Sequence, residues 1–273
     1  MGKKNGAQEF HHKHSLGQNF LTDEALFAQL VDAANVGEND AILEIGPGAG
    51  GMTKELAKRC KSVLALEIDE TLLPILRIAL ADYPNVTVVH GDVMRVRLPE
   101  LTKELGAFHI VANLPYYLTT PLMEMLLKSD LPILSMSVML QLEAAEKLCS
   151  APREDGYGPL AIRAQWFYEP EIAMTVPACM FTPPPKVDSA FLTMRRREAP
   201  PFAVKDEKLL FKLVNAAFAM RRKTLVNNLM NAFSMEREQA LSLLMSAGLS
   251  ANVRGEELSV KEFASLANAL SDA

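Results

Sequence analysis

Cysteine is scarce in this sequence, and its spacing suggests no cross-link. Only three cysteines occur in 273 residues, at Cys60, Cys149 and Cys179. They stand far apart and form no CxxC pair, so neither a disulfide framework nor a zinc site is suggested. We expect three reduced thiols and no bound metal.

Long hydrophobic runs are missing as well. No apolar run reaches the roughly 18 residues that a membrane-spanning helix needs, and the polar N-terminus lacks the hydrophobic stretch of a signal peptide. No internal repeat or low-complexity tract is present. We therefore expect a cytoplasmic protein without membrane segments, and a monomer is the default expectation.

Excess positive charge is absent from the chain as a whole. The net charge is −5, which by itself argues against a nucleic-acid partner. The charge is unevenly distributed, however: +2 in residues 1–22, −10 in 23–185, +6 in 186–237 and −3 in 238–273. The two positive segments are candidate nucleic-acid contacts, with an ordinary solvated surface as the alternative.

The composition is that of a folded protein, with 49% hydrophobic and 22% charged residues. Short β-rich runs alternate with helical patterns, which is typical of a parallel sheet built from crossover units. Strands are predicted at 41–45, 63–67, 86–90, 109–112, 134–140, 165–175 and 189–195. Helices are predicted at 53–59, 69–80, 121–127 and 142–149. The fold class is therefore α/β.

The pattern changes after Arg195. Pro200 and Pro201 mark a linker, and beyond it the apolar residues recur at helical spacing with no strand candidate. We predict a small all-α C-terminal domain of about four helices. The expected organisation is a basic, histidine-containing arm at 1–22, an α/β domain at 23–197 and the helical domain at 198–273.

A glycine-rich turn follows the first predicted strand and precedes a helix. It reads Glu44-Ile-Gly46-Pro-Gly48-Ala-Gly-Gly51, and glycines allow a ligand to approach the backbone closely. Glu67 ends the second strand 21 residues after Gly46, where an acidic residue can accept hydrogen bonds from ribose hydroxyls. Asp92 follows the third strand and is a candidate contact for an adenine amino group, with a turn or helix cap as the alternative. The turn resembles the acidic-x-Gly-x-Gly-x-Gly motif of S-adenosylmethionine-dependent methyltransferases.

The sequence Asn113-Leu114-Pro115-Tyr116 ends the fourth predicted strand and suits methylation of an adenine amine. The lone pair of that nitrogen is delocalised into the ring, so two acceptors aimed at the amino hydrogens would stabilise the charge that develops in the transition state. The Asn113 side chain and the Leu114 carbonyl are the candidate acceptors, with Pro115 holding Leu114 extended. Tyr116 and Phe181 would stack on the flipped base. The alternatives are a plain strand-to-loop turn and, for Phe181, core packing.

Together these motifs strongly resemble the bacterial small-subunit (16S) ribosomal RNA adenine N6,N6-dimethyltransferases over nearly the whole chain. The matching segments are 16–21 (LGQNFL), 44–48 (EIGPG), 67–69 (EID), 113–116 (NLPY), 181–189 (FTPPPKVDS), 218–225 (FAMRRKTL) and 254–259 (RGEELS). The resemblance implies a doubly wound, Rossmann-like methyltransferase sheet with an antiparallel last strand. It also implies that the helical domain helps to grip the ribosomal subunit.

The resemblance also assigns roles to individual residues. It implies S-adenosyl-L-methionine as the cofactor, bound by Gln18, Asn19, Leu21, Gly46, Gly48, Glu67, Asp92 and Asn113. Its implied substrate is 16S rRNA in the assembling small subunit, where two adjacent adenosines of the 3'-terminal hairpin become N6,N6-dimethyladenosines. The RNA-binding candidates are Lys186, Arg221, Arg222 and Lys223. His11, His12 and His14 of the arm are interpreted as part of a polar tail rather than as a metal site.

Three alternatives remain at this point. A related enzyme that methylates one adenine of 23S rRNA shares the glycine turn and the Asn-Leu-Pro-Tyr motif, but the segments at 221–224 and 254–259 favour the small-subunit enzyme. A non-catalytic assembly factor would not need the intact cofactor residues. A small-molecule methyltransferase would leave the basic stretch from Lys186 to Arg237 unexplained.

Overall fold

The computed structural model describes residues 20–21 and 23–272. Seven strands form one mixed sheet in the order β4-β3-β2-β5-β6-β9-β7. They are β2 (Ala41–Ile45), β3 (Ser62–Glu67), β4 (Val86–His90), β5 (Phe108–Asn113), β6 (Ile133–Gln141), β7 (Tyr168–Val176) and β9 (Ser189–Arg196). The order reverses at β2, and in open α/β sheets such a switch point leaves a ligand-binding crevice at the carboxyl ends of the strands.

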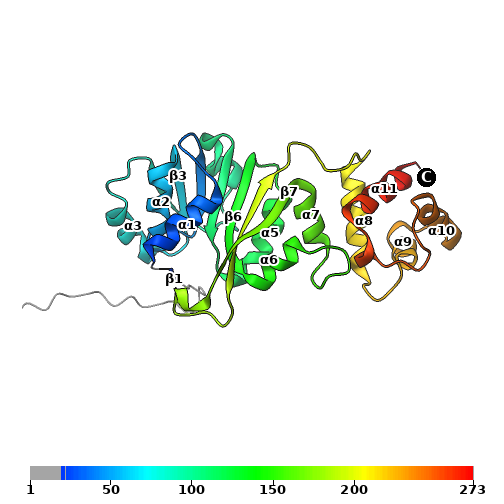
Figure 1. Cartoon of the computed structure of the whole chain (residues 1–273). Coiled ribbons are helices and arrows are strands. Elements are labelled where there is room, and N and C mark those ends of the chain that lie inside the picture. The colour runs from blue at the N-terminus through cyan, green and yellow to red at the C-terminus, as the bar shows by residue number, and fades with distance from the viewer. Residues whose placement is uncertain (1–19, 22, 273) are drawn as a thin grey trace, which may run out of the picture.

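Helices cover both faces of this sheet (Figure 1). The helices up to residue 167 are α1 (Glu24–Ala34), α2 (Gly51–Arg59), α3 (Leu73–Ala79), α4 (Leu98–Leu101), α5 (Thr119–Leu127), α6 (Leu142–Cys149) and α7 (Pro159–Phe167). One apolar cluster joins α1 and α2 to the sheet through Leu30, Leu56 and Val111. A second cluster joins α4, α5 and α6 to the opposite face. The inner strands β3, β2, β5, β6 and β9 are therefore buried on both sides, which explains their almost continuous apolar sequence, whereas the edge strands β4 and β7 remain partly exposed.

The predicted antiparallel last strand is confirmed. Strand β9 runs antiparallel to β6, pairing Leu140 with Ala190, and antiparallel to β7 on its other side. The strands β4, β3, β2, β5 and β6 are mutually parallel. A separate two-stranded sheet pairs β1 (Phe20–Leu21) with β8 (Phe181–Thr182).

The prediction of a strand at 165–175 was wrong at its start. Residues 159–167 form helix α7, and the strand begins only at Tyr168. Pro159 opens the helix, a position where its missing N–H costs nothing. Trp166 is fully buried and donates a hydrogen bond from Nε1 to Glu207 Oε2 at 3.0 Å, so packing against the C-terminal helices decides the conformation here. The sequence analysis also missed α1, whose N-terminus is capped by the Asp23 carboxylate.

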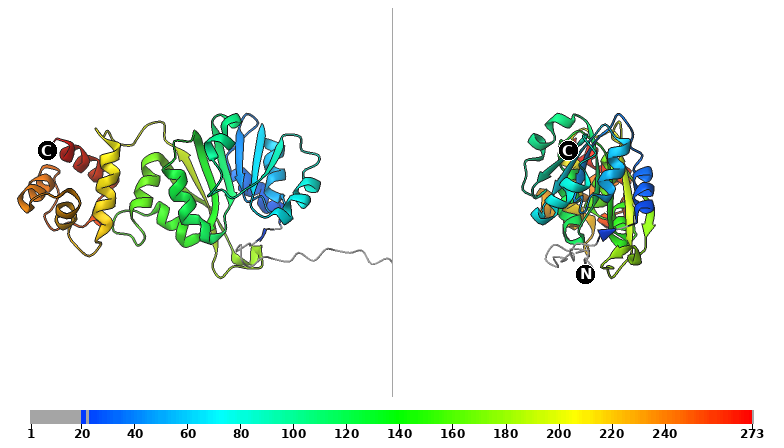
Figure 2. Two further views of the ribbon diagram at one scale, coloured as in Figure 1. Left: turned by 180° about the vertical axis from the view of Figure 1, so that it is seen from behind. Right: turned by 90° about the vertical axis from the view of Figure 1, so that its left-hand side faces the viewer.

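The C-terminal region is helical, as predicted. It contains α8 (Glu207–Ala219), α9 (Leu225–Phe233), α10 (Arg237–Ser246) and α11 (Val260–Ser271). These helices lie beyond β7 and α7, at the end of the molecule opposite α3 (Figures 1 and 2). Their apolar core includes Tyr157, Ile162 and Trp166 from around α7. That core includes residues on both sides of the proposed division between 197 and 198. The domain boundary at this point stays a prediction.

Candidate active site

A cavity of about 620 Å³ opens at the carboxyl ends of β2, β3, β4 and β5, next to the β1–β8 pair. The structure brings ten of the predicted site residues to its lining. They are Leu21, Gly46, Gly48, Glu67, Asp92, Asn113, Leu114, Pro115, Tyr116 and Phe181. Gln18 and Asn19 lie outside the described residues. The sequence thus predicted which segments meet here, while the role of each residue stays a prediction.

The glycine turn forms the floor of this cavity. Gly48 has a φ of +60°, and a Cβ atom at this position would come within 3.2 Å of the Phe20 ring. Gly46 has a φ of +74° and lies beside the Asn113 carbonyl, which a Cβ atom would approach to 3.5 Å. A side chain at either position would be strained and would fill the space between the turn and its neighbours.

Glu67 ties the end of β3 to the glycine turn. Its Oε2 accepts a hydrogen bond from the Gly48 N–H at 3.1 Å, and its Oε1 accepts one from the Asp69 N–H at 2.8 Å. The side chain is 3% exposed, and burial raises the pKa of its carboxyl group. Each carboxylate oxygen can accept a second hydrogen bond, so Glu67 can hold the turn and still bind hydroxyl groups of a ligand.

Asp92 occupies the corresponding position after β4. Its Oδ1 accepts a hydrogen bond from the Met94 N–H at 2.9 Å, and its Oδ2 lies 3.3 Å from Arg95 Nε. Oδ1 of Asp92 therefore stabilises the turn after β4, which was the alternative role considered for this residue. The residue also lines the cavity, so the two interpretations are compatible.

Glu44 is the most unusual ionisable group of the site. Its side chain is completely buried, and neither carboxylate oxygen has a hydrogen-bond partner among the described residues. Burial raises its pKa to about 8. No hydrogen bond of normal geometry joins the nearby Thr53 hydroxyl to the Glu44 carboxyl group. Thr53 lowers the pKa of Glu44, but by less than burial raises it. An unpaired buried carboxyl group beside a ligand cavity is suited to a cationic ligand group, because such a group would stabilise its charged form.

The Asn113–Leu114 segment presents two acceptors at the end of β5. The Leu114 N–H donates to the Met139 carbonyl at 3.1 Å, which fixes the backbone as it leaves the sheet. Within residues 20–21 and 23–272, no donor hydrogen-bonds to the Asn113 side-chain oxygen or to the Leu114 carbonyl oxygen. Pro115 has φ −58° and ψ 136°, so the chain remains extended after Leu114. Asn113 and Leu114 both line the cavity.

Tyr116 begins the short 3₁₀ helix Tyr116–Leu118. Its hydroxyl lies 2.9 Å from the Ser189 hydroxyl at the start of β9, and burial raises its pKa. The ring is half-buried at the cavity wall. The neighbouring Tyr117 is 58% exposed and lines the same cavity.

Phe181 packs in the core and also lines the cavity. It pairs with Leu21 across β1 and β8, is 3% exposed and packs in the core cluster with Phe191. Core packing is therefore part of its role. The side chain also lines the cavity, so its stacking on a base stays a prediction.

The four predicted RNA-binding residues are all exposed, but they do not gather at the cavity. Lys186 lies in the loop between β8 and β9, and Arg221, Arg222 and Lys223 lie in the turn between α8 and α9. That turn belongs to the C-terminal helices at the far end of the molecule (Figure 1). None of the four residues lines the cavity. A substrate that contacts both places must therefore be large.

Several lining residues were missed by the sequence analysis. Phe20 and Phe27 form an aromatic wall beside the glycine turn, close to Gly48 and Gly51 respectively. Phe20 belongs to the Leu-Gly-Gln-Asn-Phe-Leu segment, so that motif already contained the signal. Nothing in the local sequence marks Phe27, because its position depends on how α1 packs against α2.

The described part of the chain contains neither a cluster of metal ligands nor a membrane-spanning helix. There, no group of three or more His, Cys, Asp or Glu side chains is arranged to hold a metal ion. His11, His12 and His14 lie outside it. None of the helices described is both long and apolar enough to cross a membrane.

Relatives and solved structures resemble this chain over most of its length. Proteins from Geobacillus thermodenitrificans and Bacillus cereus, both named "Ribosomal RNA small subunit methyltransferase A", are 46% and 45% identical to it. Each alignment spans 268 residues and covers 96% of this chain and 92% of the relative. The structure of the 23S rRNA methyltransferase ErmE matches with a TM-score of 0.74 and 28% identity, covering 93% of this chain and 100% of that one.

A dimethyladenosine transferase from Plasmodium falciparum has the same fold, with a TM-score of 0.77 at 22% identity, and covers 90% of this chain and 95% of that one. The family described as "Ribosomal RNA adenine dimethylase" matches residues 9–272. The resemblance predicted from the motifs is confirmed: this chain belongs to the ribosomal RNA adenine dimethylase family.

Proposed function

We propose that this protein transfers methyl groups from S-adenosyl-L-methionine to the N6 amines of two adjacent adenosines in the 3'-terminal hairpin of 16S rRNA. The substrate is the assembling small ribosomal subunit. One observation carries the proposal: a single cavity is lined by the acidic and glycine residues at the ends of β2, β3 and β4 and by Asn113 and Leu114, whose two acceptor oxygens have no donor among the described residues. Cofactor and target amine can therefore meet in one cavity.

The residues present fit the cofactor. S-adenosyl-L-methionine supplies an electrophilic methyl group and carries a cationic amino group. Glu44, buried and without a hydrogen-bond partner in the described part of the chain, would neutralise that amino group from behind the glycine turn. Glu67 would accept hydrogen bonds from the ribose hydroxyls, and Asp92 would accept one from the adenine amino group. Gln18, Asn19 and Leu21 would close this side of the site.

The residues around Asn113 would act on the target adenine. The Asn113 side-chain oxygen and the Leu114 carbonyl accept hydrogen bonds from its two amino hydrogens, which favours a pyramidal nitrogen with an available lone pair. Tyr116 and Phe181 hold the flipped base between them. The neutral amine would form its new bond to the methyl carbon as the bond from that carbon to sulfur breaks, and its proton would pass to water afterwards, so the scheme needs no general base. Positioning and electrostatics account for the catalysis.

Recognition of the subunit would take place outside the cavity. Lys186, Arg221, Arg222 and Lys223 are exposed cations on two separate segments, which suits phosphate contacts on a folded RNA rather than base reading. A ribosomal subunit is large enough to contact both segments at once. We expect the protein to work in the cytoplasm as a monomer.

The decisive experiment combines labelled S-adenosyl-L-methionine with undermethylated small subunits, followed by mapping of the modified bases. We expect label on two adjacent adenosines near the 3' end of 16S rRNA, up to four methyl groups per subunit. Fully methylated small subunits are the matched control and should accept none. Subunit binding without label would instead indicate a non-catalytic assembly factor, and label on a small molecule alone would indicate a different substrate class.

A second candidate is methylation of one adenine of 23S rRNA. The structural match to ErmE favours it, because the similarity includes the C-terminal helices and not only the sheet. The higher identity to proteins named as small-subunit methyltransferases favours our proposal. Large-subunit RNA in a parallel reaction separates the two, since exclusive labelling there would contradict the proposed function.

A further inference from the structure

We propose that Asn228 is a positioning residue for RNA binding. Its buried side chain would hold the basic turn, defined here as residues 220–224, in the conformation that presents Arg221, Arg222 and Lys223 to phosphate groups. The inference rests on the proposed function, because it assumes that these three cations contact RNA. It adds a residue that touches neither the RNA nor the cofactor.

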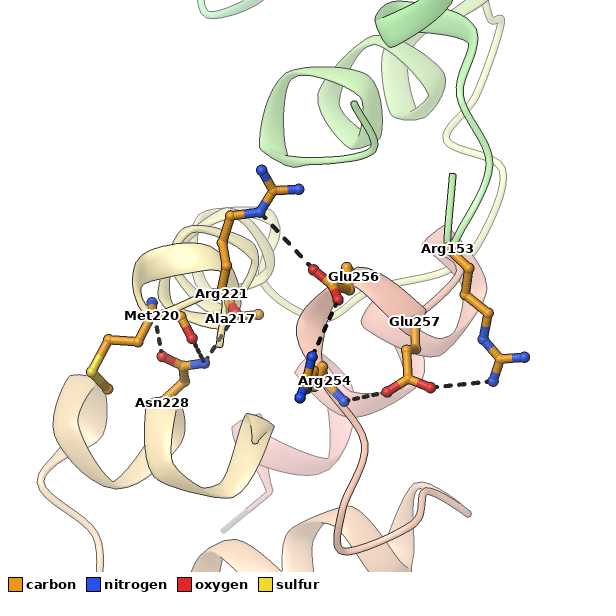
Figure 3. A network of polar contacts seen from close by, with 8 residues as sticks. All are labelled: Arg153, Ala217, Met220, Arg221, Asn228, Arg254, Glu256 and Glu257. Atoms are coloured by element: carbon orange, nitrogen blue, oxygen red, sulfur yellow. Dashed lines mark hydrogen bonds and ion pairs between the residues drawn. The ribbon is translucent and has the colours of Figure 1, made fainter. Parts of the chain in front are cut away.

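Asn228 binds the turn at several points. It lies in α9 and is 2% exposed. Its Nδ2 donates to the Ala217 carbonyl at 3.1 Å, and its Oδ1 accepts from the Met220 N–H at 3.1 Å (Figure 3). The carbonyls of Met220 and Thr224 lie 3.4 and 3.5 Å from the same Nδ2. One amide group therefore connects the last turn of α8 to both ends of the basic turn.

The end of α8 needs this side chain. Met220, the residue that follows the helix, has φ −126° and ψ 79°, so no left-handed glycine terminates α8 in the usual way. The last carbonyls of a helix have no partner within the helix and must be satisfied elsewhere. Asn228 satisfies the Ala217 carbonyl, and the turn adds one internal bond, from the Lys223 N–H to the Met220 carbonyl at 2.9 Å.

The segment that carries the Arg-Gly-Glu-Glu motif supports the same end of α8 from another side. A Cβ atom on Gly255 would lie 2.5 Å from the Ala217 carbonyl oxygen, so only glycine allows this approach. The Leu225 N–H, just after the turn, donates to the Val253 carbonyl at 2.8 Å. The backbone that flanks the basic turn is thus fixed from two directions.

The charged groups of the turn remain available. Arg221 lies 4.0 Å from Glu256, which in turn lies 3.9 Å from Arg254 (Figure 3). The Arg221 side chain is 61% exposed, and exposed ion pairs of this kind are weak. A phosphate group can therefore replace Glu256 as the partner of Arg221 while Asn228 keeps the backbone in place. A preorganised turn loses less conformational entropy on binding than a mobile one.

The experiment compares Asn228→Asp with Asn227→Asp. Both add one negative charge to the same helix, but only the first replaces the amide donor with an oxygen that faces three carbonyl groups. Tryptic cleavage after Arg221, Arg222 or Lys223 in the RNA-free protein reports how often the turn opens. We expect cleavage about tenfold faster in Asn228→Asp and within about twofold of wild type in Asn227→Asp.

RNA binding supplies the second measurement. We expect Asn228→Asp to bind undermethylated small subunits at least about fivefold more weakly, with a shallower dependence of affinity on salt. The kcat at saturating subunit concentration and the Kd for S-adenosyl-L-methionine should stay unchanged, because the turn is remote from the cavity. Unchanged cleavage would overturn the inference, as would faster cleavage with unchanged affinity and salt dependence.

Two additional variants complete the design. If Asn228→Asp does not unfold cooperatively, Asn228→Ser, which replaces the amide by a shorter side chain with one hydroxyl group, is measured in the same way and must meet the same criteria. Replacement of Arg221, Arg222 and Lys223 by alanine tests the RNA contact itself. If that variant binds subunits normally, the RNA contact and the inference about Asn228 both fail, while methylation by the wild-type protein still tests the proposed reaction. If it binds weakly and Asn228→Asp binds normally, only the inference fails.

Discussion

The hydroxyl groups of Tyr116 and Ser189 lie 2.9 Å apart and join the turn after β5 to the first residue of β9. Ser189 is fully buried, so this bond connects the wall of the cavity to a buried residue of the main sheet. It orients a tyrosine ring that would otherwise rotate freely about its side-chain bonds. The proposed stacking of adenine on Tyr116 thus depends on a residue 73 positions away in the sequence.

Substitution of Tyr116 separates the ring from its hydroxyl. Tyr116→Phe keeps the stacking face and loses only the bond to Ser189, so we expect kcat to fall by only a few-fold. Tyr116→Ala removes the face, and base–aromatic stacking is worth about 1–3 kcal/mol, so we expect roughly a 5- to 150-fold loss of kcat/KM. Single-turnover methylation of small subunits measures both. An equal loss of kcat/KM in Tyr116→Phe and Tyr116→Ala would contradict the stacking role.

Asn113→Ala tests the amine-acceptor role. Loss of one preorganised polar group at the reacting centre typically lowers kcat by about 10²–10³-fold. We expect a loss of at least this size, with subunit binding preserved because the exposed cations are untouched. Filter binding of labelled subunits provides the control. Undiminished turnover would exclude Asn113 from the chemistry.

Glu44 should make both stability and cofactor binding depend on pH. Its pKa is about 8 in the folded protein against an ordinary value of 4.5. Between pH 4.5 and about pH 8 the folded state therefore holds a proton that the unfolded state has lost. The contribution of Glu44 to stability is therefore fully present below about pH 4.5 and declines as the pH rises to about 8, by at most about 1.4 kcal/mol per pH unit. Glu44→Gln should remove this decline, which Tm measurements at pH 5, 6.5 and 8 would reveal.

The same group should release a proton when the cofactor binds at pH 7. A cationic amino group beside Glu44 favours the charged carboxylate and lowers its pKa. Calorimetric titration of S-adenosyl-L-methionine in buffers of different ionisation enthalpy measures this release. Glu44→Gln should abolish it and weaken binding. The same proton release in wild type and Glu44→Gln would show that another group is responsible.

Charge reversal in the basic turn tests its contact with RNA. Arg221→Glu combined with Arg222→Glu should weaken subunit binding and lower its salt dependence, since each lost phosphate contact reduces the log–log slope by roughly 0.7–0.9. Lys261→Glu, on α11, changes the charge in the same direction outside the turn and serves as the control. A salt slope identical to that of wild type would remove these arginines from the interface.

Gly255→Ala should destabilise the C-terminal helices. The added methyl group would lie 2.5 Å from the Ala217 carbonyl oxygen, so the backbone must shift. Such overpacking typically costs about 1–3 kcal/mol. Gly37→Ala is the matched control, because nothing lies within 4 Å of the methyl group there. Thermal unfolding of the two variants gives the comparison, and equal Tm values would contradict the close approach.

Local sequence patterns determined the elements of this protein. A nearly continuous apolar run predicted β2 with its observed bounds, and helical spacing predicted α6 at 142–149, because burial on both faces or on one stripe leaves a direct trace in the sequence. The bounds of the edge strand β4 were predicted from its β-rich residues, although none of them is fully buried. The motifs also predicted which segments line the cavity, since the carboxyl ends of parallel strands meet at one edge of a sheet.

Only the tertiary structure decided the remaining features. Residues 165–167 are helical because Trp166 packs into the core of the C-terminal helices, which no local pattern announces. The burial of Glu44 without a hydrogen-bond partner among residues 20–21 and 23–272, and the bonds of Asn228 to the end of α8, depend on side chains brought together by folding. Whether a polar group is satisfied, and how strongly its pKa is shifted, depends on its neighbours in space, and these the linear sequence does not specify.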